Sequence, residues 1–315
     1  MKLHAPFIQL PLAFDAAALA DEVRALGEAP WKPHPQGFPG NSMLPLVAVG
    51  GDADNEAFAG VMAPTPALLA CPRLQQVFAS LGATIGRSRL MRLSGMAEVS
   101  RHTDQGYYWA ERVRVHVPLV TQPTVRFECG DAAVHMAAGE CWIFDTWRQH
   151  RVLNHATQAR IHLVVDTVGG ARFWDLVGRG RPHDVQPPGW APAPIAASPA
   201  ALAFECEQVN VPAVMTPWEL QHHLEFLLDE AIAHPVLPEL ARHVGTLLQG
   251  WRGLWAAHGD AQSARPAYRQ AFAAFIAAVK PRAAGVVLRN EMPWLEVVQA
   301  MLGRAVVAWP PPAGR

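Results

Sequence analysis

The feature that most constrains the fold is a series of short apolar segments between residues 86 and 169, each bounded by turn-forming residues. In the stretch RVRVHV, residues 112–117, valines alternate with basic side chains, which is the two-residue period of a β-strand. Several such segments with Gly, Asn, Asp or Pro between them predict an all-β sandwich or barrel. No long helical pattern interrupts the series, which argues against parallel βαβ units.

Helical patterns lie on both sides of this region. Residues 15–27 predict a short helix that begins after Asp15, and residues 66–81 predict a helix that Pro72 divides. Further helices are predicted at 216–234, 238–258, 265–280 and 293–306. The first of these has the form of a capping box, because Thr216 precedes proline and is followed three residues later by Glu219.

A Pro- and Ala-rich stretch at residues 184–201 separates the two kinds of sequence and predicts a linker or a surface strap. We therefore expect a mainly β domain with N-terminal helices over residues 1–183. An α-helical C-terminal subdomain is expected over residues 202–315.

The charge balance limits the partners. The chain has 315 residues, with 26 Lys or Arg against 27 Asp or Glu, so its formal net charge is −1. A near-neutral chain argues against nucleic acid or an anionic membrane as the main partner. With no apolar run of transmembrane length and no secretory signal, we expect a cytoplasmic protein. The four cysteines form no C-x-x-C pair, and Cys129 and Cys141 are expected to be buried apolar groups.

His102 and Asp104 are two residues apart, so their side chains point to one side of an extended chain. By itself this pair is more often a solvated strand end than a site. His150 and Arg160 follow on later strand-like segments. Two histidines and one carboxylate form the facial triad of non-haem Fe(II) oxygenases, and a nearby guanidinium matches a cosubstrate carboxylate.

Taken together, the segments HTD, RVRVHVPLV, VRFECG, VHMAAGECWIFDTWRQHRVLN and ARIHLVVD resemble the aspartyl/asparaginyl β-hydroxylase family of Fe(II)- and 2-oxoglutarate-dependent dioxygenases. The bacterial free-proline hydroxylases look most similar. The resemblance covers about residues 86–170. It implies a double-stranded β-helix, or cupin-like jelly roll, in which the strands of His102 and His150 face each other at a barrel mouth. It also implies Fe(II) and 2-oxoglutarate as cofactors, with dioxygen and a small-molecule substrate as partners.

The resemblance also implies roles for individual residues. The iron ligands, and thus the catalytic residues, would be His102, Asp104 and His150. The cosubstrate would be held at its 5-carboxylate by Arg160 and near its 1-carboxylate by Arg114 and His116. The animal members of the family have glycine at the position of Asp104, so the complete triad favours a free amino acid, with proline as the leading candidate. Candidate substrate contacts are Tyr107, Trp109, Trp147 and Arg148.

Other interpretations remain open at this stage. The substrate could be Asp or Asn in a peptide or protein, the scaffold could carry a cupin-like hydrolase or isomerase, or the chain could be a non-catalytic metal- or ligand-binding module. Arg112 is expected in solvent. Asp145 is expected to cap a turn rather than to orient a ligand histidine, and His135 to be a sheet histidine rather than a ligand.

Overall fold

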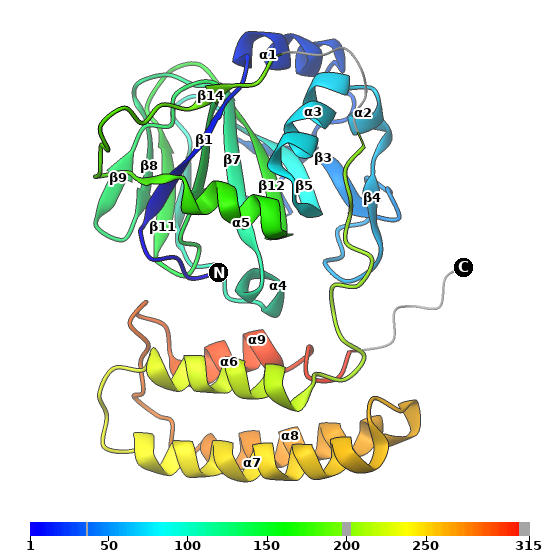
Figure 1. Cartoon of the computed structure of the whole chain (residues 1–315). Coiled ribbons are helices and arrows are strands. Elements are labelled where there is room, and N and C mark those ends of the chain that lie inside the picture. Colours follow the sequence, from blue (N-terminus) through cyan, green and yellow to red (C-terminus); the bar gives the residue numbers. More distant parts are fainter. Residues whose placement is uncertain (36, 197–202, 309–315) are drawn as a thin grey trace. The chain divides into compact units, whose positions relative to one another are not determined.

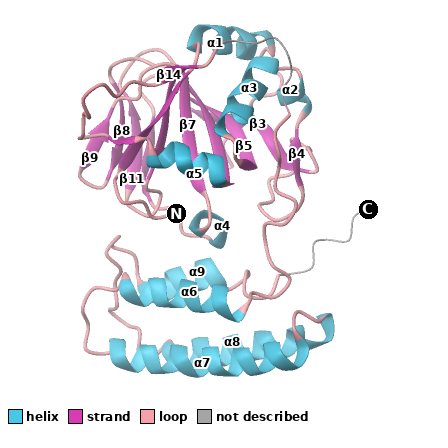
Figure 2. Cartoon of the chain, viewed as in Figure 1, coloured by secondary structure: helices cyan, strands magenta, loops and turns pink. Residues whose placement is uncertain are grey.

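The structure, a computed structural model, describes residues 1–35, 37–196 and 203–308. Contacts divide the chain into two compact units. The first, here called the β unit, consists of Met1–Asp104 and Glu111–Asn210. The second, the helical unit, consists of Gln105–Ala110 and the chain from Val211 onward. Figure 1 shows the path of each unit, and Figure 2 shows that strands dominate the first and helices the second.

The β unit contains a large sheet in which the strand order is β13-β1-β10-β7-β12-β5-β3-β2, with β14 paired to β1 and β4 paired to β3. Its strands are β1 (Phe7–Ala13), β2 (Lys32–Pro33), β3 (Asn41–Val49), β4 (Met62–Pro64), β5 (Thr84–Leu93), β7 (Val113–Val120), β10 (Glu140–Phe144), β12 (Arg160–Gly169), β13 (Arg181–Pro182) and β14 (Ala193–Pro194). Apart from the β1–β14 pair these strands run antiparallel.

A smaller sheet has the order β6-β11-β8-β9 and is antiparallel throughout. Its strands are β6 (Glu98–His102), β8 (Val125–Cys129), β9 (Ala132–Val134) and β11 (His150–Asn154). Together the two mainly antiparallel sheets form the predicted jelly roll. The mainly β fold with a helical C-terminal part is therefore confirmed.

Helices cover one face of the large sheet. They are α1 (Ala16–Ala25), α2 (Pro66–Leu69), α3 (Pro72–Leu81) and α5 (Ala171–Gly178). Asp15 caps α1 through the amide of Ala18, and Pro72 separates α2 from α3, as the sequence predicts. Their apolar side chains join one core with the outward-facing valines of β7, the odd-numbered residues 113, 115 and 117.

The even-numbered residues of β7 therefore face the opposite, inner side of the sheet. The same alternation holds on β12, where Leu163 and Val165 enter the helix-covered core while Arg160 and His162 turn inward. The two-residue period of the sequence thus separates a packed outer face from a polar inner face.

The helical unit is built from α4 (Tyr107–Ala110), α6 (Pro217–Asp229), α7 (Leu237–His258), the short 3₁₀ helix η1 (Gln262–Ala264), α8 (Arg265–Val279) and α9 (Trp294–Leu302). Thr216 caps α6 through the amide of Glu219, as predicted. The carboxylate of Glu219 accepts a hydrogen bond from the hydroxyl of Tyr107, at 2.6 Å. This hydrogen bond links α4 to α6 within the helical unit.

None of the helices in the described ranges combines the length and the apolar character that a membrane crossing requires.

Candidate metal centre

Strand pairing brings the two predicted histidine ligands together. His102 ends β6, His150 begins β11, and the two residues lie directly opposite each other in the antiparallel pair. Their ring centroids are 4.3 Å apart. The expectation that their strands face each other across a barrel mouth is wrong, because the strands are hydrogen-bonded neighbours in the smaller sheet. Pairing on adjacent strands holds the two histidines closer together and more rigidly than positions on opposite sides of a barrel would.

Asp104 completes the cluster from the segment just beyond β6. Its amide donates to the carbonyl of Thr146, at 3.2 Å, which fixes the backbone. Its carboxylate oxygens lie 4.0 Å from Nε2 of His102 and 4.0 Å from Nε2 of His150. One ligand atom from each of the three residues lies within 4.8 Å of the others.

Backbone carbonyls determine which ring nitrogen of each histidine is available. Nδ1 of His102 lies 2.8 Å from the oxygen of Ser100, and Nδ1 of His150 lies 2.9 Å from the oxygen of Arg148. A carbonyl can only accept, so in both rings Nδ1 carries a proton, and the lone pair of the neutral ring is on Nε2. Both Nε2 atoms are the ones near Asp104, an arrangement typical of metal-ligating histidines.

The electrostatic setting keeps His150 and Asp104 in their ligand forms. Burial lowers the pKa of His150 to about 4, against the opposing effect of Asp104, so the ring is neutral near neutral pH. Burial would raise the pKa of Asp104, but Arg114 and then the two histidines outweigh it and hold that pKa below its usual value. A neutral imidazole and an ionised carboxylate are the states that bind a metal ion.

A row of alternating charges supports Asp104. Arg114 donates from Nη1 to Asp104, at 3.2 Å, and from Nε to Asp166, at 2.9 Å. Arg89 on β5 lies 4.0 Å from the other oxygen of Asp166. Asp166 and Arg89 were not among the predicted site residues, although Asp166 shares the inward face of β12 with Arg160 at even spacing. That period-two signal could have found it.

The predicted cosubstrate residues line the inner face of the large sheet. His116 and Arg160 are both buried, and so is His162, on which no prediction was made. The ring of His116 packs in a T-shaped arrangement against Phe127 and Phe144, with ring centroids 5.2 and 5.4 Å apart. Burial, followed by the charges of Arg160 and Arg114, holds the pKa of His116 well below its ordinary value. The imidazole is therefore a neutral polar group in an aromatic wall.

The four candidate substrate residues have different surroundings. Tyr107 and Trp109 belong to α4, in the helical unit. Trp147 is buried in the β unit. The guanidinium of Arg148 forms an ion pair with the buried Asp145, at 3.0 Å, so part of its charge is already compensated within the fold. Their role toward a substrate stays a prediction.

Arg112 is a correction. It is 3% exposed rather than solvated, because its guanidinium makes a two-point contact with the buried Glu207, at 2.7 and 3.0 Å. Asp145 does cap the turn, since it accepts from the amide of Trp147. His135 was expected on a strand but lies just beyond the end of β9, where its ring contacts the carbonyl of Val125, at 3.1 Å. Cys129 and Cys141 are buried, as expected.

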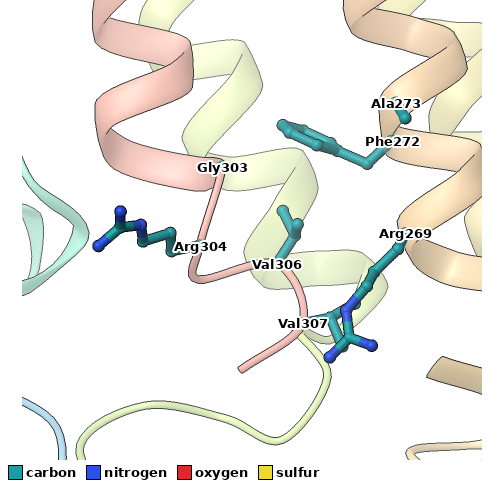
Figure 3. A pocket seen from close by; sticks show the side chains of 7 residues that line it. All are labelled: Arg269, Phe272, Ala273, Gly303, Arg304, Val306 and Val307. Carbon is teal, nitrogen blue, oxygen red and sulfur yellow. The ribbon is translucent and has the colours of Figure 1, made fainter. Parts of the chain in front are cut away.

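A cavity of about 680 Å³ lies in the helical unit, between α8 and the segment after α9. Figure 3 shows Phe272 and Val306 projecting toward it, with the guanidinium of Arg269 beside Val307. The described residues of its lining include no histidine, cysteine or carboxylate, so they offer no set of metal ligands. Among the described residues, the cluster that could hold a metal ion is His102, Asp104 and His150.

Comparison with known proteins identifies a matching family. Residues 57–169, which include the triad and Arg160, match the family model described as aspartyl/asparaginyl beta-hydroxylase. No curated protein matches the chain.

Solved structures with some similarity include an oxidoreductase of the 2OG-Fe(II) oxygenase family from Burkholderia pseudomallei, with 16% identity over 53% of this chain and 88% of that chain and a TM-score of 0.39. A prolyl-4-hydroxylase from Pseudomonas putida has 18% identity over 52% and 92% of the two chains, with a TM-score of 0.36. A prolyl hydroxylase from Trichoplax adhaerens has 13% identity over 54% and 87%, with a TM-score of 0.37. Similarity at this level bears on neither the reaction nor the substrate of this chain.

The residues present fit the cofactors of the family. Two imidazoles and one carboxylate form a donor set suited to Fe(II), and one ligand atom of each lies within 4.8 Å of the others. For 2-oxoglutarate, the buried guanidinium of Arg160 has an Nε atom without a hydrogen-bond partner. A dicarboxylate would supply the missing negative charge.

Proposed function

We propose that this chain, in which residues 57–169 match the aspartyl/asparaginyl β-hydroxylase family model, hydroxylates a free amino acid or a small amino-acid-like compound, with proline as the leading candidate. The observation that carries the proposal is the complete cluster of His102, Asp104 and His150. A family member that keeps the carboxylate resembles the small-molecule hydroxylases rather than the animal members, which have glycine there. Succinate and carbon dioxide are the expected co-products.

In this proposal, His102 and His150 bind Fe(II) through Nε2, and Asp104 binds it through its carboxylate. When bound, the iron would supply the oxidising chemistry, with 2-oxoglutarate and dioxygen as cosubstrates. The protein's contribution is to hold the ligands in place. Arg114 keeps Asp104 ionised and oriented, and the carbonyls behind the two histidines keep each Nε2 lone pair directed at the site.

The same proposal gives the inner face of the large sheet to the cosubstrate. Arg160 would bind the 5-carboxylate of 2-oxoglutarate, for which a guanidinium is a matched two-point donor. Arg114 and His116 would lie near the 1-carboxylate. Nδ1 of His162 lies 3.4 Å from Nδ1 of His116 and 2.9 Å from Nη2 of Arg160, so these side chains share one region of the barrel interior.

The direct test is turnover. Purified protein with Fe(II), ascorbate and 2-oxoglutarate is incubated with single amino acids, and succinate release is measured together with the gain of one oxygen atom in the amino acid by mass spectrometry. We expect proline to stimulate succinate release and to gain the oxygen. Hydroxylation of Asp or Asn in peptides, with no free amino acid modified, would replace this proposal by the peptide alternative.

A variant separates the enzyme from a non-catalytic binding module. Asp104→Ala removes one of three ligands, so we expect iron affinity to fall by more than the roughly 10–100-fold that loss of an outer-shell partner costs. Asp229→Ala, at an exposed position of α6, is the control and should bind iron like the wild type. If Asp104→Ala also binds iron like the wild type and the wild type shows no turnover, the triad is not the catalytic centre.

A further inference from the structure

Arg160 is a buried cation whose hydrogen-bond partner is an imidazole. Its side chain is 4% exposed, and Nη2 lies 2.9 Å from Nδ1 of His162, two residues along the same strand. Its Nε is buried and has no partner. Within the described ranges no carboxylate lies within the 4.0 Å of an ion pair with Arg160. The positive charge of Arg160 is therefore oriented by a neighbour but not neutralised.

Three other arginines of the β unit have a carboxylate neighbour. The buried Arg112 makes a two-point contact with Glu207, and the partly buried Arg114 contacts both Asp104 and Asp166. The buried Arg89 lies 4.0 Å from Asp166. A charge taken out of water is costly unless an opposite charge accompanies it. The exception at Arg160 is consistent with a site that receives its counter-charge from a ligand rather than from the fold.

The chemistry of the two groups determines the direction of the hydrogen bond. A guanidinium can only donate, so Nδ1 of His162 must present its lone pair to Arg160. The ring proton of a neutral His162 is then on Nε2, which is buried and has no partner. Nδ1 of His116 lies 3.4 Å from the same lone pair and can donate to it as a second, weaker contact.

A neutral acceptor and a charged one would have opposite effects at this position. Burial, followed by the charge of Arg160, holds the pKa of His162 well below its ordinary value, so the ring stays neutral. An imidazole fixes the plane of the guanidinium and leaves its charge for an incoming anion. A carboxylate in the same place would fix the plane equally well but would compete with that anion.

We propose that His162 is a positioning residue that orients Arg160 toward the distal carboxylate of 2-oxoglutarate while leaving the guanidinium charge uncompensated. This inference rests on the role proposed above for Arg160, but not on the identity of the hydroxylated substrate. It adds a residue to which the sequence analysis assigned no role.

Three side chains of nearly equal size provide the test. His162→Asn keeps a neutral acceptor near the position of Nδ1, His162→Leu removes the acceptor, and His162→Asp adds a negative charge. The dissociation constant of 2-oxoglutarate is measured by calorimetry on protein loaded with Mn(II) in place of iron, after circular dichroism has shown that each variant is folded. We expect Asn to bind within about threefold of the wild type, and Leu about tenfold more weakly, the value of one charged hydrogen bond.

For Asp we expect binding at least about a hundredfold weaker, because Arg160 is then neutralised. In turnover assays the Leu variant should show a raised KM for 2-oxoglutarate with kcat nearly unchanged at saturation. Binding by the Asp variant as tight as by Asn would overturn the proposal, and so would wild-type affinity in the Leu variant. Because the binding measurement needs no amino acid, a wild type that binds 2-oxoglutarate but hydroxylates nothing would count against the proposed substrate alone.

Discussion

The interiors of the two units contain different kinds of side chain. Buried side chains that carry a formal charge or an imidazole ring include, in the β unit, Arg87, Arg89, Arg112, His116, Asp145, His150, Arg160, His162, Asp166 and Glu207. In the described part of the helical unit the corresponding residues are His223 and Glu230, within a core that includes Trp251, Tyr268, Phe275 and Trp294. Both units are packed, but only the first retains a concentration of charge that packing alone does not require.

This difference separates residues that stabilise a fold from residues that serve a site. An apolar side chain removed from water contributes free energy to folding, whereas a buried charge without a counter-charge costs free energy. A core that retains such charges gives up stability for binding. The comparison predicts that substitutions with similar burial should have opposite effects on stability in the two units.

The largest expected effect is at Trp251, in the centre of the helical unit. Its ring is fully buried, packs on Tyr268 at 4.7 Å and donates from Nε1 to the carbonyl of Met215. Trp251→Ala should lower the free energy of unfolding of this unit by about 3–5 kcal/mol. Hydrogen exchange followed by mass spectrometry reports each unit separately. Trp218→Ala, at a 71% exposed position, is the control and should change little.

The next effect has the opposite sign. Arg160→Leu replaces a buried, uncompensated charge with an apolar side chain, so the free energy of unfolding of the metal-free β unit should rise by about 1–3 kcal/mol, although 2-oxoglutarate binding is lost. Chemical denaturation and calorimetry measure the two properties. Arg126→Leu, at an exposed position of β8, should alter neither. A destabilisation as large as that of Trp251→Ala would contradict the comparison.

Acid should weaken the β unit more than the helical unit. In the helical unit, burial lowers the pKa of His223 to about 4. In the β unit, burial lowers the pKa of three histidines, which are His116, His150 and His162. Histidines of the unfolded chain have a pKa of about 6.5. As pH falls below this value, the unfolded chain binds protons that the buried rings of the folded protein do not bind. Each ring then lowers the free energy of unfolding by up to about 1.4 kcal/mol per pH unit.

Hydrogen exchange of the metal-free protein between about pH 6.5 and pH 4.5 measures this dependence in each unit. His223→Leu should flatten the pH dependence of the helical unit and leave that of the β unit as it was. Equal slopes in the two units of the wild type would show that the buried histidines are not neutral.

The smallest expected effect concerns α4. Tyr107→Phe removes the hydrogen bond from the Tyr107 hydroxyl to Glu219 and should lower the local stability of α4 by about 1–2 kcal/mol. Glu219→Gln keeps an acceptor and should cost less. Exchange rates of the amides in residues 105–110 measure both. Equal protection in all three proteins would show that the hydrogen bond does not hold α4.

What could be predicted from the sequence was local. The alternation around Arg114 and His116 predicted which side chains enter the core and which face the inner side, because a strand has a fixed two-residue period. The caps at Asp15 and Thr216 were also local signals, because Asp and Thr are preferred at the N-cap of a helix. The triad was found through the spacing of three residues together with the family resemblance.

What could not be predicted depends on partners distant in the chain. Arg112 was expected in solvent because its neighbours suggest a loop, but its partner Glu207 lies 95 residues later. The hydrogen bond from Arg160 to His162 requires knowing which rotamers a barrel interior permits. The strand β1 shows no alternation, since nearly every residue in it is buried, and so it carries no period-two signal.

The assignment of residues 105–110 to the helical unit has a consequence for how the chain can be divided. Residues of the helical unit interrupt the sequence of the β unit, so dividing the chain at one position does not yield either unit complete. A truncation after Asn210 would remove Glu219 and leave Tyr107 without that acceptor. The helical unit therefore cannot be exchanged between homologues as one continuous segment. The exchange must also replace the residues that follow Asp104.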